Sequence, residues 1–147
     1  IATPGHTLTH FTYFFPGLRA LFTGDTLFGA GCGRLFETGP SPMLDSLNTC
    51  AAVGGDVLVY CGHEYTEENL RFAQIVEPGN AAVRTRYREV KVLLRKGLPT
   101  VPSRMDLEKE TNPFLRVTHP TIRKQLHLDD ATDAEVFAEL RKRKDGF

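Results

Sequence analysis

The sequence has 147 residues, 41% of them hydrophobic, and this size predicts one domain with a core of its own. Lys and Arg together number 18, as do Asp and Glu, so no net charge draws the chain to nucleic acid or to a membrane surface. No apolar run reaches the roughly 20 residues that a membrane-spanning helix needs. The three cysteines are odd in number and irregularly spaced, which argues against a disulfide framework and favours a reducing cytoplasm.

The first 65 residues are rich in glycine, threonine and short apolar runs. In chain order, we expect strands at residues 11–15 and 18–23 joined by a turn at Pro16-Gly17, a glycine-rich loop at 24–33, a helix at 41–53 and a strand at 56–61. Residues 1–3 look like the last part of another strand.

The remainder of the chain has helical spacing. Helices are expected at residues 66–76, 81–96, 121–126 and 132–142, with a proline-containing loop at 97–102. A strand-rich half followed by a helical half predicts either two subdomains or one α/β layer with a helical cap.

One local setting occurs three times. An apolar stretch ends, a glycine follows, and a metal-capable side chain comes next: His6 after Gly5, Asp25 after Gly24 and His63 after Gly62. Glycine frees the backbone just past a strand, so the next side chain can turn into the crevice at the strand ends. His and Asp together suit a borderline cation such as zinc. Two histidines and one aspartate cannot close a structural site, but they fit part of an open catalytic site in which a carboxylate bridges two metals.

Each of these residues has an ordinary structural alternative. A single His after Gly is commonly a turn or surface residue, Asp25 could cap a turn, and His63 could hydrogen-bond within the core. The basic run from Arg141 to Lys144 is equally expected as a solvated helix end that favours the helix dipole. The recurrence of the setting is what favours a metal site.

Several motifs resemble those of the glyoxalase II (hydroxyacylglutathione hydrolase) family, within the metallo-β-lactamase superfamily. The matching segments are Thr3-Pro4-Gly5-His6-Thr7, Gly24-Asp25-Thr26-Leu27-Phe28, Gly31-Cys32-Gly33-Arg34, Tyr60-Cys61-Gly62-His63-Glu64-Tyr65-Thr66, Asn69-Leu70-Arg71-Phe72-Ala73, Glu77-Pro78-Gly79-Asn80, Thr100-Val101-Pro102-Ser103, Asn112-Pro113-Phe114-Leu115-Arg116 and the terminal residues 141–147. They cover nearly the whole chain in the right order.

The resemblance implies an α/β fold: the C-terminal half of a metallo-β-lactamase-type αββα sandwich in residues 1–76, followed by an α-helical substrate-binding domain in residues 77–147. It implies a cytoplasmic thioesterase that splits S-(2-hydroxyacyl)glutathione, typically S-D-lactoylglutathione, into glutathione and D-lactate, the second step of methylglyoxal detoxification. The cofactors would be two divalent metal ions, zinc before iron or manganese. A glutathione thioester is the expected partner, nucleic acid and membrane are not, and the full-length protein is expected to be a monomer.

The resemblance also assigns roles to residues. His6 would bind the first metal, His63 the second, and Asp25 would bridge the two and orient the attacking water. The glutathione part of the substrate would be held by seven residues: Arg34, Phe36, His63, Glu64, Tyr65, Arg141 and Lys144. Arg and Lys are natural partners for the two carboxylates of glutathione. Cys32 and Cys61 are expected to have structural roles.

Two positions depart from the family pattern. Thr9 stands where the family has glycine, and Phe36 stands where a tyrosine is frequent, so a hydroxyl contact is lost. His10, four residues after His6, is expected to pack against or support the site rather than bind metal.

The other metal ligands of the family lie in a His-x-His-x-Asp-His motif upstream, which these 147 residues do not contain. We therefore expect the sequence to be part of a longer chain and, alone, to bind metal poorly, turn over little substrate and aggregate through exposed sheet edges. Two alternatives stay open: a relative of the single-iron persulfide dioxygenases, and a metal-free interaction domain of the same fold.

Overall fold

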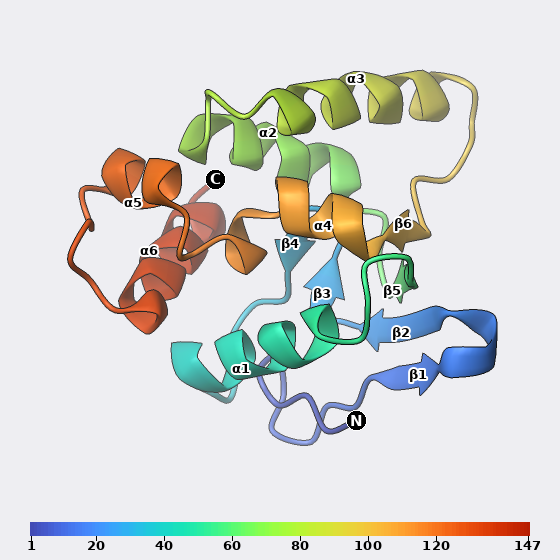
Figure 1. The fold of residues 1–147 in the computed structure, drawn as a ribbon, viewed down its shortest axis with the longest axis horizontal. Coiled ribbons are helices and arrows are strands. Elements are labelled where there is room, and N and C mark those ends of the chain that lie inside the picture. The colour runs from blue at the N-terminus through green and yellow to red at the C-terminus, as the bar shows by residue number, and fades with distance from the viewer.

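A computed structural model describes all of residues 1–147. Its main sheet has four strands in the order β1-β2-β5-β6, and β3 and β4 form a separate hairpin (Figure 1). The strands are β1 Tyr13–Phe15, β2 Ala20–Gly24, β3 Leu27–Phe28, β4 Gly31–Cys32, β5 Leu58–Cys61 and β6 Ser103–Arg104. The α-helices are α1 Pro40–Ala51, α2 Thr66–Val76, α3 Ala81–Arg95, α4 Met105–Thr111, α5 Pro120–Leu126 and α6 Asp133–Asp145; the 3-10 turns are η1 Pro16–Leu18 and η2 Pro113–Leu115.

The two central strands, β2 and β5, run parallel, with Leu21 opposite Val59. Parallel neighbours need a long crossover, and here it contains the β3–β4 hairpin and α1. Strands β1 and β6 pair antiparallel at the two edges. Because β2 and β5 point the same way, the residues that follow them lie at one edge of the sheet.

The sequence predicted most of these elements. The expected strands and helices are present with ends shifted by a few residues, and α6 runs three residues beyond its expected end. The first strand is shorter than predicted, since Phe11 forms only an isolated bridge with Ala2. That bridge is also the only β-structure of residues 1–3.

One expectation was wrong. The loop predicted at residues 24–33 contains the β3–β4 hairpin, in which Leu27 pairs with Cys32. The four glycines of this segment led to the prediction of a loop. In the structure the apolar residues of β3, Leu27 and Phe28, are buried. Helix α4 and strand β6 were not predicted; β6 has only two residues, which are too few for a periodic pattern.

Helix ends follow the capping chemistry of the sequence. The Asn80 side chain accepts a hydrogen bond from the backbone N–H of Val83 and begins α3. At the start of α6, Thr132 and Glu135 exchange hydrogen bonds in a capping box. None of the helices combines the length and apolarity that a membrane crossing requires.

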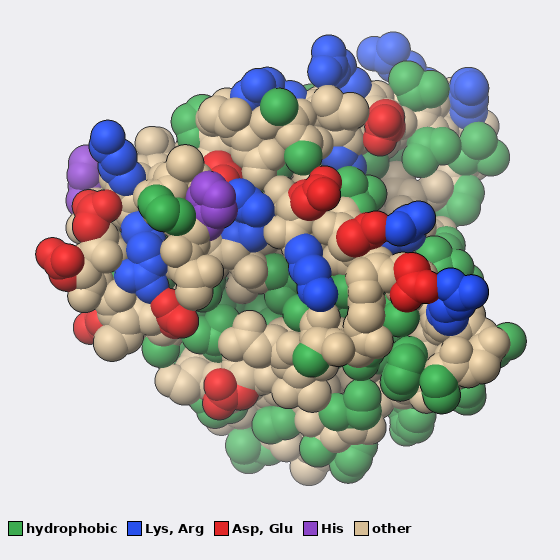
Figure 2. Space-filling view, viewed as in Figure 1, with side chains coloured by type: hydrophobic (Ala, Val, Ile, Leu, Met, Phe, Trp, Pro, Cys, Tyr) green, Lys and Arg blue, Asp and Glu red, His purple; other side chains and the backbone are tan.

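Several large apolar side chains on β1 and β2 stay exposed. Tyr13 is 63% exposed and Phe22 is 42% exposed, and Phe22 stacks on Tyr60 with 4.8 Å between the ring centroids. Phe15 meets the Phe22 ring edge-on at 5.7 Å. Figure 2 shows hydrophobic side chains gathered in the lower part of the view, where these strands lie. Contiguous apolar rings of this kind mark a surface that a partner element can cover.

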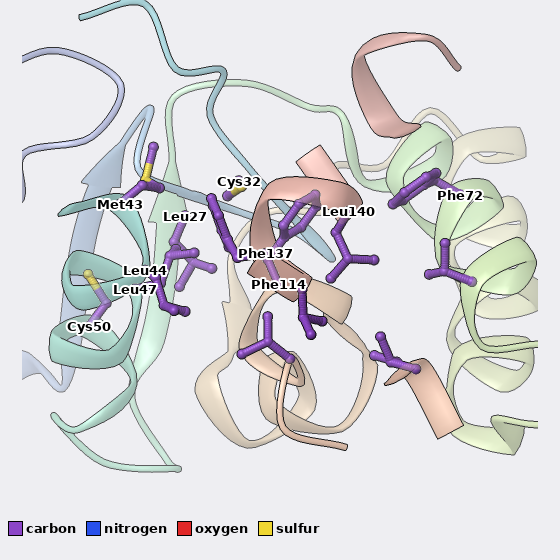
Figure 3. Packing of buried hydrophobic residues seen from close by; sticks show 14 of the residues in the cluster. Leu27, Cys32, Met43, Leu44, Leu47, Cys50, Phe72, Phe114, Phe137 and Leu140 are labelled. Carbon is purple, nitrogen blue, oxygen red and sulfur yellow. The ribbon is translucent and has the colours of Figure 1, made fainter. Parts of the chain in front are cut away.

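The main hydrophobic core lies between α1, α6 and the central strands (Figure 3). Phe114 and Phe137 are buried in it and meet edge-on with 5.6 Å between ring centroids. Leu47 from α1 and Leu140 from α6 are fully buried in the same cluster. Each such side chain contributes about 1.5–3 kcal/mol by leaving water. Strand-rich and helical parts of the chain therefore share one core.

A buried polar cluster connects the hairpin to the helices. The Glu108 carboxylate is fully buried and accepts from the backbone N–H of Ala30 (2.8 Å), the Arg86 guanidinium (2.5 Å), the Ser103 hydroxyl (2.5 Å) and the Asn112 amide (3.3 Å). The Asn112 amide also donates to the carbonyl of Gly31 at 2.9 Å. This cluster, called the Glu108 cluster below, fixes the hairpin tip from α3 and α4.

Candidate metal centre

Asp25 and His63 lie beside each other at the carboxyl ends of β2 and β5. Asp25 follows the last residue of β2, and His63 follows β5 after Gly62. The Gly62 backbone N–H donates to the carbonyl of Gly24 at 2.9 Å, which joins the two strand ends. A Cβ at Gly62 would lie 2.6 Å from Asp25 Oδ1, so only glycine lets the strands close up here. The sheet therefore explains the Gly-Asp and Gly-His spacing.

His6 reaches the same point from the first loop. Its Nδ1 donates to the carbonyl of Arg34 at 2.9 Å, and this hydrogen bond leaves Nε2 without a proton in the neutral ring. Nε2 lies 3.6 Å from Asp25 Oδ2. A backbone carbonyl on one ring nitrogen and a free lone pair on the other is the usual setting of a metal-binding histidine.

Asp25 stands between the two histidines. Its Oδ1 is 3.4 Å from His63 Nε2, and its Oδ2 is 3.6 Å from His6 Nε2. No group of three or more His, Cys, Asp or Glu side chains converges on a single point that could hold one metal ion. Instead, each carboxylate oxygen faces a different histidine. This arrangement has the form of a bridging carboxylate with one cation position on each side, and it offers two ligands to each position.

Aromatic rings surround His63. Its imidazole stacks on Tyr65 with 5.0 Å between centroids and 20° between planes, and the Phe28 ring lies 6.0 Å away. On the other side of Asp25, the edge of His6 meets Phe36 at 5.0 Å. These rings pack against both histidines and limit the orientations of their imidazoles.

A cavity of about 580 Å³ opens from this centre. His6, Asp25 and His63 form one end of it, and Phe28, Phe36 and Tyr65 form apolar walls. The volume suits a small peptide-sized ligand.

Charged side chains also line the cavity. Lys144 pairs with Glu68, and its side chain is only 8% exposed. Arg34 is 68% exposed, with its Nε 3.8 Å from Asp145 Oδ1. Arg141 also lines the cavity, but its guanidinium is buried, donates to the carbonyl of Cys32 at 2.9 Å and pairs with Asp145 at 2.8 Å. Arg34 is therefore the cation that an anionic ligand reaches most readily, whereas the side chains of Lys144 and Arg141 are both largely buried and paired with carboxylates.

Comparison with known proteins agrees with these observations. Residues 64–147 match the model described as hydroxyacylglutathione hydrolase C-terminus, and residues 1–63 match that of the metallo-beta-lactamase superfamily. The chain belongs to the hydroxyacylglutathione hydrolase family.

Relatives in this family match the chain along its entire length. It is 53% identical over 147 residues to a hydroxyacylglutathione hydrolase of Brucella anthropi, and covers 56% of that protein. It is 49% identical to one of Chelativorans sp. and covers 58% of it. The chain thus spans little more than half the length of these relatives. The metallo-β-lactamase-type α/β fold expected from the sequence is confirmed, as is the family resemblance.

The structure brings eight of the nine predicted site residues to one cavity: His6, Asp25, Arg34, Phe36, His63, Tyr65, Arg141 and Lys144. Glu64 is the exception. Its carboxylate accepts from the backbone N–H groups of Thr100 (3.1 Å) and Val101 (3.2 Å) and from the Thr100 hydroxyl, so it anchors the loop before β6. This anchor holds the segment next to His63.

Seven other residues line the cavity without having been predicted as site residues: Phe28, Cys32, Gly33, Glu68, Asn69, Asp145 and Phe147. The sequence did contain a local indication for Asp145. It follows Arg141 by four residues on a helix, a spacing at which opposite charges pair, and the two residues do pair. Phe28 lies in the β3–β4 hairpin, which was predicted as a loop. Glu68 and Phe147 reach the cavity only through packing of α2 against the end of the chain.

Proposed function

We propose that the protein containing this chain hydrolyses S-(2-hydroxyacyl)glutathione thioesters, S-D-lactoylglutathione above all, to glutathione and a 2-hydroxy acid. The observation that carries the proposal is the placement of Asp25, with one histidine at each carboxylate oxygen, at the end of a cavity that also presents Arg34 and Lys144. The hydroxyacylglutathione hydrolase names of the relatives support it.

The residues present fit half of a two-cation site. His6 and Asp25 would hold one cation, and Asp25 and His63 the other. Imidazole and carboxylate donors suit zinc, which we propose as the metal. When bound, the two cations supply Lewis-acid activation of water and of the thioester carbonyl.

The chain's own residues then perform two tasks. Arg34 and Lys144 bind the carboxylates of the glutathione part by charge-assisted hydrogen bonds, while Arg141 holds the cavity wall behind them. Phe28, Phe36 and Tyr65 hold the ligand beside the centre and exclude bulk water. The glutathione thiolate leaves without a proton donor, because a thiol of pKa about 8.5 is a good leaving group near neutral pH.

Two further predictions from the sequence stay predictions. Residues 1–76 would provide the metal site and residues 77–147 most of the contacts with glutathione. The three cysteines, none of which forms a disulfide, support a cytoplasmic location.

The test compares two substitutions in the full-length gene product. Asp25→Asn removes the shared ligand, and we expect its metal content and thioester hydrolysis to fall by more than the roughly 10- to 100-fold that loss of a supporting residue costs. Asp45→Asn is the matched control, since Asp45 is exposed on α1. Wild-type protein that binds no divalent metal, or that leaves S-D-lactoylglutathione intact, would refute the proposal.

A further inference from the structure

His10 contacts Asp25 but does not line the cavity. Its Nε2 accepts the backbone N–H of Asp25 at 3.2 Å. Gly24 makes this contact feasible: its φ of +48° turns the chain at the end of β2, and a Cβ there would lie 2.7 Å from His10 Nε2. The glycine before Asp25 thus leaves room for a histidine as well as for the turn.

The other ring nitrogen of His10 is also engaged. Nδ1 lies 2.9 Å from the Thr26 hydroxyl and 3.0 Å from the Thr3 hydroxyl, and both threonines are fully buried. Because Nε2 must accept, the neutral ring carries its proton on Nδ1, where a threonine hydroxyl accepts it.

The same residue joins the loop of His6 to the end of β2. The backbone N–H of Thr3 donates to the carbonyl of His10 at 2.9 Å, and Thr26 Oγ1 also lies 3.4 Å from Thr3 Oγ1. The segments that carry His6 and Asp25 therefore meet at His10. A small movement of its ring would shift both side chains relative to each other.

We propose that His10 is a positioning residue, which fixes the backbone of Asp25 through Nε2 and so sets the carboxylate between His6 and His63. The inference rests on the proposed two-cation function. Direct metal binding by His10 does not fit, because Nε2 faces an N–H donor and Nδ1 faces two hydroxyls. A purely space-filling role of His10 does not account for these contacts either, since both ring nitrogens form hydrogen bonds.

Two substitutions separate the contacts of the ring. His10→Gln places an amide oxygen where Nε2 lies and keeps an acceptor for the Asp25 N–H. His10→Asn places its amide near the threonine hydroxyls, in the position of Nδ1, and is too short to reach Asp25. Both are made in the full-length gene product. Zinc affinity is measured by competition with a chromogenic chelator, and the thermal unfolding of each metal-free protein is recorded alongside.

We expect His10→Asn to weaken zinc binding roughly 10- to 100-fold, as loss of a supporting contact does, and His10→Gln to stay within about threefold of wild type. Equal zinc affinity in all three proteins, or equal loss in both variants, would overturn the proposal. Loss of zinc affinity that follows a lowered melting temperature of the metal-free protein would count as a folding effect and also overturn it.

A measurement on the unaltered protein covers the case in which a variant does not fold. The nitrogen-15 shifts of His10 should report the neutral tautomer with its proton on Nδ1, with and without zinc. A proton on Nε2 would overturn the proposal. Failure of the proposed function is distinguishable, because it appears as absence of zinc binding or thioester hydrolysis in the wild type.

Discussion

Replacing Glu108 by Gln tests the Glu108 cluster. The carboxylate accepts four hydrogen bonds, two at each oxygen, and the residue is fully buried. Glutamine has nearly the same volume but only one oxygen, so in either orientation its amide nitrogen faces two donors. The Arg86 guanidinium, itself only 3% exposed, loses its counter-charge.

The cost follows from these contacts. Two buried donors without an acceptor cost about 1–3 kcal/mol each. Removing one partner of a buried ion pair costs about 3–5 kcal/mol. This figure and the cost of the two unsatisfied donors are two estimates of the same loss of stability, so they are not added. We therefore expect the free energy of unfolding to fall by about 3–5 kcal/mol, a large share of the roughly 5–15 kcal/mol of an ordinary domain.

Urea unfolding of wild type and variant measures the difference. Glu110→Gln is the matched control: Glu110 is exposed on the same helix, and its substitution should change stability by less than about 0.5 kcal/mol. A loss below about 1 kcal/mol for Glu108→Gln would refute the reasoning. It would mean that the hydrogen bonds in the folded protein stabilise the buried carboxylate no more than hydrogen bonds to water do.

Two further predictions concern ionisation. Burial raises the pKa of Glu77, but hydrogen bonds from Arg116, Asn80 and Thr121 outweigh it and leave the pKa below its ordinary value. Its contribution is therefore present above the unfolded-state pKa of about 4.3 and is lost as the pH falls through the lower folded-state value. Glu77→Gln should flatten the acid side of the stability curve in urea titrations at several pH values; an unchanged curve would contradict this. Burial raises the pKa of Cys32 to about 12, so iodoacetamide should leave Cys32 unmodified in native protein at pH 8 and alkylate it in urea, by peptide mass spectrometry. Rapid native alkylation would contradict it.

The sequence predicted the convergence of His6, Asp25 and His63 better than the walls of the cavity. Asp25 and His63 follow apolar strands directly, so local pattern placed them, and the parallel pairing of β2 with β5 brought them together. The same setting predicted His6, although the segment before it forms only one isolated bridge. Local pattern was sufficient where a side chain is fixed by the strand it follows.

The cavity walls depend on contacts that no local pattern contains. The basic run at residues 141–144 is one example: Arg141 is buried against a distant carbonyl, Lys144 pairs with Glu68, and Arg143 faces Glu139 on the exposed side. The four consecutive basic residues in the sequence do not indicate which of them is buried, which pairs across the cavity and which stays exposed. The tertiary packing of α6 decides which of them turn inward, since Arg141 meets the end of β4 and Lys144 meets α2.

The hydrogen bond from Arg141 to the carbonyl of Cys32 joins residues 109 positions apart. Chains are synthesised from the N-terminus at roughly 5–20 residues per second, so about 5–20 seconds pass between the appearance of these two residues. In the later part of that interval Asp25 and His63 have been synthesised, while α6 has not. A newly made molecule therefore passes through a stage in which its future ligand-binding side chains are open to ions and solvent, and closes over them last.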